Sequence, residues 1–211
     1  MFSPCVGLSA DGTRAATGTV ELKGALDVWD INQGKSISKL GVLPSSVYSD
    51  PVWSPDGKRV VCNDMSSALH AFDVHAGKLI GVLGKGSFGQ CRIRSVWLSD
   101  NNRLITAGWG RDEVHLVEIG KTTPNMTINA GGGQVKWVAL HPSEKWIATC
   151  GYKTPVQIWH LPTARLVKSW QIGPVKGTVN QVEFSPDGNY LATVNGNGTA
   201  YILSLDGILI E

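Results

Sequence analysis

Long apolar runs and long runs of one charge are both missing from this sequence. Charged residues make up 17% of the chain, and the 19 basic and 17 acidic residues are scattered along it. No segment is apolar over the length that crossing a bilayer requires, and the first residues do not form a charged and then apolar signal sequence. We therefore expect a cytoplasmic protein whose partner is neither nucleic acid nor a membrane.

Cysteine is scarce, and its spacing is not that of a metal site. Cys5, Cys62, Cys91 and Cys150 form no C-x-x-C pair, and no histidine stands beside them at the spacing that zinc ligands need. We expect four free thiols, no metal and no cofactor.

Glycine and tryptophan are abundant instead. The chain holds 25 glycines and 8 tryptophans, and 42% of its residues are apolar, which is enough for a substantial core. Many glycines between short runs of strand-forming residues are typical of short strands joined by tight turns. The composition therefore predicts an all-β chain.

One short turn sequence recurs along the whole chain. Ser54-Pro55-Asp56-Gly57 returns as Ser185-Pro186-Asp187-Gly188, and looser copies begin at Ser9, Ser99 and His141. The copies follow one another at intervals of 42 to 45 residues. Five repeats of this length fill the chain.

The residues around the turn recur in columns. Directly before it stand Leu8, Trp53, Leu98, Leu140 and Phe184, and after it come a strand of small residues, as in Ala15-Ala16-Thr17, and a third strand, as in Val28-Trp29-Asp30. A glycine turn and a fourth strand, as in Leu79–Leu83, complete each unit. Four strands in each repeat predict the blades of a β-propeller, and we expect Trp53, Trp159 and Phe184 to be buried between blades.

The turn S-P-D-G, the strand endings Val28-Trp29-Asp30 and Ile158-Trp159-His160 and the following Gly-Lys turn resemble those of the WD-repeat family. The resemblance covers the chain and implies blades at about residues 1–42, 43–85, 86–130, 131–173 and 174–211. The last repeat, from Leu191 to Leu203, resembles the final repeat of large bacterial WD-repeat proteins.

The sequence also departs from that family. No Gly-His pair occurs, and the position of the blade-tying aspartate holds Lys23, Ser66, Arg111, Lys153 and Asn197. We therefore expect apolar burial and backbone ladders to be the main forces that hold the blades.

The number of repeats predicts how the blades are arranged. Seven blades are usual in the family, and only four residues precede the first strand here, so Ile208-Leu209-Ile210 would supply the last outer strand. The expected fold is thus a β-propeller of five four-stranded antiparallel blades that form an open arc or partial propeller rather than a closed ring. Such an arc would leave Ala16, Leu26 and Val28 bare at one end and Leu191, Ile202 and Leu203 bare at the other, so we expect self-association or marginal stability.

One segment imitates a nucleotide-binding loop. Gly84-Lys85-Gly86-Ser87-Phe88-Gly89 has the spacing of the glycine-rich loop of protein kinases, but the lysine, catalytic loop and metal-binding aspartate of that chemistry are missing. We expect a turn between blades.

Histidines and acids also occupy repeat columns. His70 and His115 share one column, His141 stands in the serine column, and most acids fall in turns or at strand ends. We therefore expect no catalytic residues, although a propeller hydrolase with carboxylates around the central funnel is the alternative.

In the resembled family, the loops between second and third strands and the connectors between blades bind partner peptides and proteins. Those segments hold Tyr48, Phe88, Trp109, Arg111, Tyr152, Lys153 and Lys176 here. Tyrosine, tryptophan and arginine often anchor interfaces. We expect these seven residues to bind a protein or peptide in a non-catalytic scaffold that is part of a larger multidomain or longer propeller protein. In the alternative, Trp109 and Tyr152 fold back over the ends of the core.

Overall fold

The computed structural model describes residues 5–19, 23–47, 49–83, 94–108, 111–131, 133–172 and 177–209. Their strands form five antiparallel sheets. The strands are β1 (Cys5–Leu8), β2 (Arg14–Gly18), β3 (Ala25–Asp30) and β4 (Lys35–Val42); β5 (Val52–Trp53), β6 (Arg59–Asn63), β7 (Leu69–Asp73) and β8 (Lys78–Leu83); β9 (Arg94–Trp97), β10 (Arg103–Ala107), β11 (Glu113–Glu118) and β12 (Met126–Asn129); β13 (Gln134–Leu140), β14 (Trp146–Tyr152), β15 (Val156–His160) and β16 (Arg165–Trp170); and β17 (Val179–Phe184), β18 (Tyr190–Asn195) and β19 (Ala200–Ser204).

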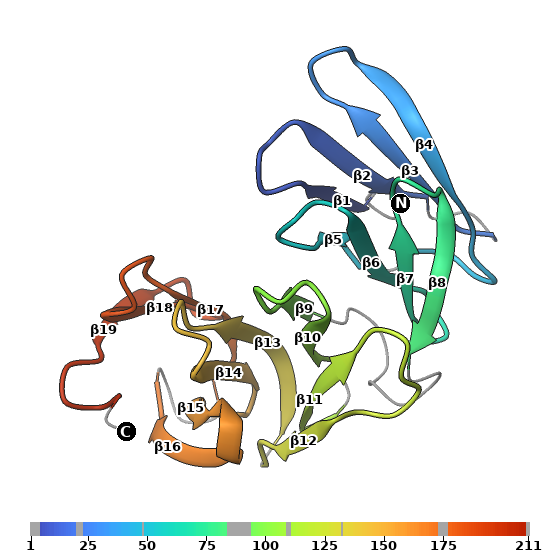
Figure 1. Cartoon of the computed structure of the whole chain (residues 1–211). Helices are drawn as coiled ribbons and strands as arrows, with labels where there is room; N and C mark the ends of the chain where they lie inside the picture. The colour runs from blue at the N-terminus through green and yellow to red at the C-terminus, as the bar shows by residue number, and fades with distance from the viewer. Residues whose placement is uncertain are drawn as a thin grey trace.

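Within each sheet the strands follow one another in chain order, each antiparallel to the last (Figure 1). One 3-10 helix, Leu161–Thr163, joins β15 to β16. No helix among the described residues is long and apolar enough to cross a membrane. The all-β prediction is confirmed.

The turn after the first strand of each sheet has the same backbone in all five sheets. Its fourth residue has a φ of 58 to 75°, a left-handed conformation that favours glycine. The amide of that residue donates to the carbonyl at the first position of the turn. The five pairs of first and fourth residues are Ser9 and Gly12, Ser54 and Gly57, Leu98 and Asn101, His141 and Glu144, and Ser185 and Gly188.

This geometry corrects the sequence alignment of the third repeat. Leu98, not Ser99, holds the position of Ser54, and Trp97 holds that of Trp53, because Trp97 pairs with Leu104 as Trp53 pairs with Val60. The sequence match of Ser99 was wrong by one residue. Asn101 has the left-handed conformation in this turn. The turn therefore lacks the glycine that shows the alignment in repeats such as the first and second.

The core lies between the sheets rather than within one of them. Four hydrophobic clusters occur among the described residues, and each joins two consecutive sheets. Trp53, Trp159 and Phe184 are each only 7% exposed and belong to three different clusters, which confirms their predicted burial.

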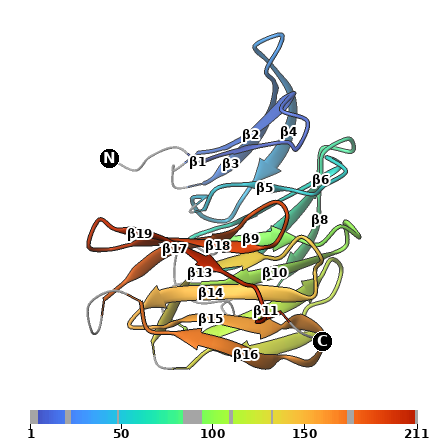
Figure 2. The ribbon, with the colours of Figure 1, turned by 90° about the vertical axis from the view of Figure 1, so that its left-hand side faces the viewer.

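The first and last sheets share none of these clusters. The inner strands β1, β5, β9, β13 and β17 contact one another in chain order. Figures 1 and 2 show the sheets as an arc whose first and last members lie apart. The open or partial propeller is therefore the observed fold.

The bare faces at the two ends are not those expected from the sequence. Ala16, Leu26 and Val28 are fully buried against the second sheet, and Leu191 is fully buried against the fourth, with Leu203 packed against the same cluster. Successive residues in a strand point to opposite faces of the sheet. The sequence therefore shows which residues share a face, but not which of the two faces packs against the neighbouring sheet. Of the six residues named, Ile202 alone is strongly exposed, at 68%.

The opposite residues of these strands form two uncovered faces. The first bare face, on β1 to β3, consists of Val6, Leu8, Ala15, Thr17, Asp27 and Trp29. The last bare face, on β18 and β19, consists of Tyr190, Ala192, Val194 and Ile202. Leu8 is 62% exposed, an unusual value for a large apolar side chain in a strand.

The last sheet has three strands among the described residues, not the four expected. Ile208 and Leu209 follow a turn in which the Ile208 amide donates to Leu205, and Leu209 packs against the cluster between the fourth and fifth sheets. Because the Leu209 side chain packs into this cluster, Ile208 and Leu209 do not run alongside β19 as the expected fourth strand would. Ile210, the third residue of the expected strand, lies outside the described residues.

Polar side chains also tie several sheets internally, beside the apolar clusters and the backbone ladders. The Trp29 and Trp159 indoles donate to Thr17 and Thr149 at 2.9 and 3.1 Å. In the second sheet Asp64, two residues before the expected position, is buried and lies 3.1 Å from the His70 ring nitrogen Nε2. Asp64 also accepts from the Ser66 and Ala68 amides, so it fixes the turn between β6 and β7.

Candidate protein-binding face

The alternating strand directions give the arc two different faces. The turns from first to second strand and from third to fourth strand lie at one end of each sheet, which we call the turn face. The loops from second to third strand, and the connectors between sheets, lie at the other end, which we call the loop face. Arg111, Tyr152 and Lys153, three of the residues predicted to bind a partner, lie on the loop face.

The structure brings Arg111 and Tyr152 to the start of one strand. The Arg111 carbonyl accepts a hydrogen bond of 3.0 Å from the Val135 amide, and Tyr152 is the ladder partner of Gln134. Two loops of consecutive sheets therefore meet at the first two residues of β13. Arg111 and Lys153 are both exposed beside this junction.

Tyr152 and Lys153 form a compact exposed pair. The Tyr152 side chain is 45% exposed, and the Lys153 ammonium lies 5.1 Å from the centre of its ring. Lys153 has a φ of 56°, a left-handed conformation that turns the chain back toward β15. Gly133 permits this approach, because a Cβ there would collide with the Tyr152 carbonyl. A ring capped by a cation is suited to contact a partner's apolar or acidic group.

Four of the predicted partner-binding residues lie outside the described residues. These are Tyr48, Phe88, Trp109 and Lys176, and the same holds for the glycine-rich segment 84–90. Their roles stay predictions. For Tyr152, an exposure of 45% shows a side chain that does not fold back over the core.

A second group of polar residues lines the inner strands, and the sequence did not single it out. The Arg94 guanidinium on β9 lies 4.2 Å from the Trp137 ring centre on β13, and Lys136 donates to Asn180 of β17 at 3.0 Å. Burial lowers the pKa of Arg94, whereas attraction to Glu183 and Asp50 opposes that shift. Glu183 is exposed at the surface, but partial desolvation raises the pKa of its carboxyl and the charge of Arg94 counteracts that shift. These residues come from different repeats, so nothing local in the sequence associates them.

Several of the other titratable groups are buried. His70 and Asp64 form a histidine–acid pair, but their side chains are only 3% and 1% exposed, so a substrate has no access to them. Burial raises the pKa of the Cys150 thiol to about 12 and that of Cys62 further, which makes both poor nucleophiles. Among the described residues, no three His, Cys, Asp or Glu side chains gather as metal ligands would.

Comparison with known sequences fits this architecture. The family profile described as "WD domain, G-beta repeat" matches residues 166–204. The match begins in β16 and ends with β19, so the sequence unit includes the outer strand of one sheet and three strands of the next. Residues 166–204 are therefore similar to a WD repeat.

Several curated WD-repeat relatives match most of the chain at low identity. Protein LST8 homolog of Drosophila melanogaster is 24% identical over 85% of this chain and 56% of its own length. WD repeat-containing protein 55 of Mus musculus is 26% identical over 74% of the chain and 39% of its own length. Autophagy-related protein 18 of Dictyostelium discoideum is 24% identical over 71% of the chain and 40% of its own length. The chain thus spans about half the length of these relatives, or less.

Proposed function

We propose that this chain is a non-catalytic scaffold that binds a protein or peptide on its loop face. The observation that carries the proposal is the junction at the start of β13, where an exposed arginine, tyrosine and lysine from two sheets gather. Backbone hydrogen bonds hold the junction, so a partner would meet a preformed surface and lose little binding energy to ordering it.

The wider setting belongs to the same proposal. We place the scaffold in the cytoplasm, with neither nucleic acid nor a membrane as its partner, and as part of a longer propeller or multidomain protein. The two bare faces and the greater length of the relatives support the proposal that the chain is part of a longer protein. The same faces would allow self-association of the isolated chain.

The loop face can be tested by peptide selection with matched variants. A displayed library of random peptides is selected on the wild-type chain, and the enriched peptides are then titrated against Arg111→Glu, Tyr152→Ala and Lys153→Glu. We expect each substitution to weaken binding by about tenfold or more, because interface anchors of this kind often contribute over 1.4 kcal/mol. Arg165→Glu, at the turn face of the same sheet, is the control and should bind as the wild type does. Enriched peptides that bind all four variants equally well would contradict the proposal.

The hydrolase alternative has its own test. Its structural support among the described residues is Glu183 on the inner strand β17, because partial desolvation raises the pKa of this carboxyl. We expect no hydrolysis of chromogenic glycoside and ester substrates. Turnover that disappears in Glu183→Gln would establish the alternative instead.

A further inference from the structure

A groove on the turn face separates the first two sheets. It encloses about 290 Å³ and is lined by Arg14, Ile37, Ser38, Asp56, Gly57, Lys58, Val74 and His75. All of these residues lie at the end of the sheets opposite to the loop-face junction at β13, so the groove is a separate feature.

The corresponding junctions between the later sheets are closed by hydrogen bonds. Between the second and third sheets, Arg59 donates to the Asn101 carbonyl at 2.7 Å. Between the third and fourth, the Ser99 amide donates to the Glu144 carboxylate at 2.6 Å. Between the fourth and fifth, the His141 ring lies 3.1 Å from the Gly188 carbonyl.

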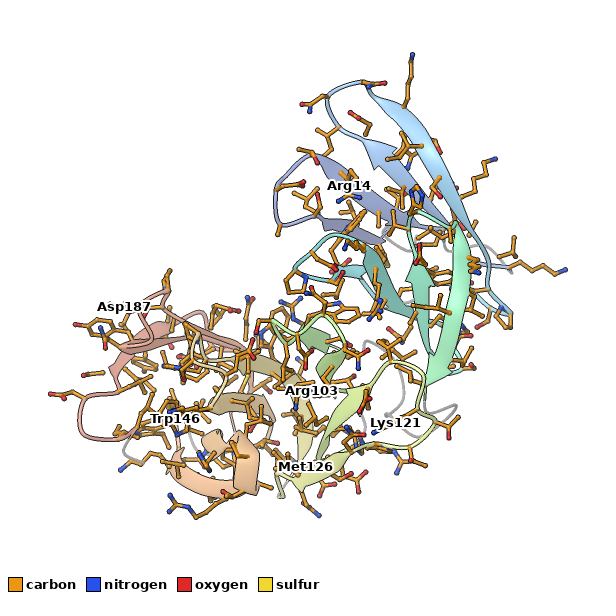
Figure 3. The ribbon with its side chains drawn as sticks, viewed as in Figure 1. Arg14, Arg103, Lys121, Met126, Trp146 and Asp187 are labelled. Carbon is orange, nitrogen blue, oxygen red and sulfur yellow. The ribbon has the colours of Figure 1, made fainter. Side chains whose placement is uncertain are left out.

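Among the described residues, the first two sheets share a hydrogen bond of 2.9 Å from the Trp53 indole to the Gly7 carbonyl, but none from Arg14 to the neighbouring turn. Arg14 holds the same repeat position as Arg59, but its guanidinium lies 4.9 Å from the Trp53 ring centre and against Gly57 (Figure 3). Within the described ranges, its side chain makes no hydrogen bond and no ion pair. Five N–H donors thus remain available at the wall of the groove.

The charges of the groove favour an anion. Lys58 is exposed and, among the described residues, has no ion-pair partner. Asp56 is the one acid in the lining, and its Oδ1 already accepts from the Ser54 hydroxyl at 2.7 Å and the Lys58 amide at 3.0 Å. Two cations therefore face the groove, while the single carboxylate is engaged in its own turn.

The lining of the groove also has an apolar part. Val74 is 6% exposed and Ile37 is 50% exposed. An aliphatic side chain packed against Ile37 would cover it and gain the free energy of burial. A ligand that suits both halves carries carboxylates next to an aliphatic residue.

We propose that this groove binds a short acidic peptide. Its carboxylates pair with Arg14, which can receive one in a bidentate manner, and with Lys58. A neighbouring leucine or isoleucine packs over Ile37 and Val74. The site is independent of the loop face, so one protein could hold two partners on opposite sides.

A fluorescein-labelled peptide, Gly-Ser-Leu-Glu-Glu-Ile-Ser-Gly, serves as the probe, and fluorescence anisotropy with the full chain gives its Kd. The control peptide has both glutamates replaced by glutamine. We expect the acidic peptide to bind at least tenfold tighter than the control and to lose affinity as salt rises, because partly exposed ion pairs are screened.

Variants then locate the site. Arg14→Ala and Lys58→Ala should each weaken binding by about tenfold, whereas Arg103→Ala, at the same repeat position in the third sheet, should leave it unchanged. Arg103, unlike Arg14, is engaged in an ion pair with Asp100. Lys58→Glu should lose the acidic peptide and gain a version with lysines in place of the glutamates, a rescue that a merely unfolded variant would not show.

Two results would overturn the proposal. One is equal affinity for the acidic and glutamine peptides, and the other is a loss of binding in Arg103→Ala as large as in Lys58→Ala. Tyr152→Ala should bind the probe normally, so failure of the loop-face proposal and failure of this one can be told apart.

Discussion

A few side-chain oxygens fix the first turn of each sheet. In the first sheet the Asp11 carboxylate accepts from the Ser9 hydroxyl at 2.6 Å and from the Thr13 amide and hydroxyl. The same arrangement recurs at Ser54 and Asp56 and at Ser185 and Asp187. These patterns could be recognised in the sequence because all the hydrogen-bond partners lie within five residues of one another.

Titration of Asp11 tests this turn. Hydrogen bonds from Ser9 and Thr13 lower the pKa of Asp11 to about 2. The native pKa lies below that of the unfolded chain, so the carboxylate contributes stability above about pH 4, and this contribution is lost as the pH falls through about 2. Ser9→Ala should raise the pKa of Asp11 toward its usual value, as measured by NMR titration of the carboxyl carbon.

Ser99→Ala is the matched control. Leu98 holds the hydroxyl position in the third sheet, so removal of the Ser99 hydroxyl should leave the pKa of Asp100 where it is. If Ser99→Ala raised the pKa of Asp100 as much as Ser9→Ala raises that of Asp11, Ser99 would hold the same repeat position as Ser9, and the corrected alignment would be wrong.

At the scale of the strand, the alternation of side chains between the two faces could be predicted, but not which face packs against a neighbouring sheet. The columns that contain Trp29, Phe72 and Trp159 are in register across the sheets, as the repeat indicated. Which face meets a neighbour depends on sheets distant in sequence, so the end faces were assigned wrongly. The groove beside Arg14 could not be predicted either. Arg14 and Arg59 hold the same repeat position, and they differ only in whether the turn of the next sheet accepts a hydrogen bond from them.

Two tryptophans at one repeat position measure what a neighbouring sheet contributes. Trp159 is 7% exposed between the third and fourth sheets, whereas Trp29 is 37% exposed on the first bare face. Both donate to a threonine of the adjacent strand. Trp159→Ala should lower the free energy of unfolding by about 3–5 kcal/mol, and Trp29→Ala by clearly less, because no second sheet covers it. Urea unfolding gives both values, and equal losses would show that the first bare face is covered.

At the scale of the molecule, the arc follows from how the clusters are shared. Each consecutive pair of sheets buries one hydrophobic cluster, and the first and last sheets bury none together. Number and order of the sheets were predictable because the repeats are local. Two features were not predictable: the last sheet has only three strands among the described residues, and the Asp64–His70 pair is buried. Each depends on packing that no repeat column records.

The molecular mass of the isolated chain in solution tests the open arc most directly. Light scattering at increasing concentration should give masses that rise above the monomer value of 22.6 kDa, because the two bare faces hold large exposed apolar side chains. The double variant Leu8→Glu and Ile202→Glu, which places a charge on each bare face, should return the mass to 22.6 kDa at every concentration. A wild-type chain that stays monomeric throughout and melts cooperatively at a temperature independent of concentration would mean that the five sheets close on themselves.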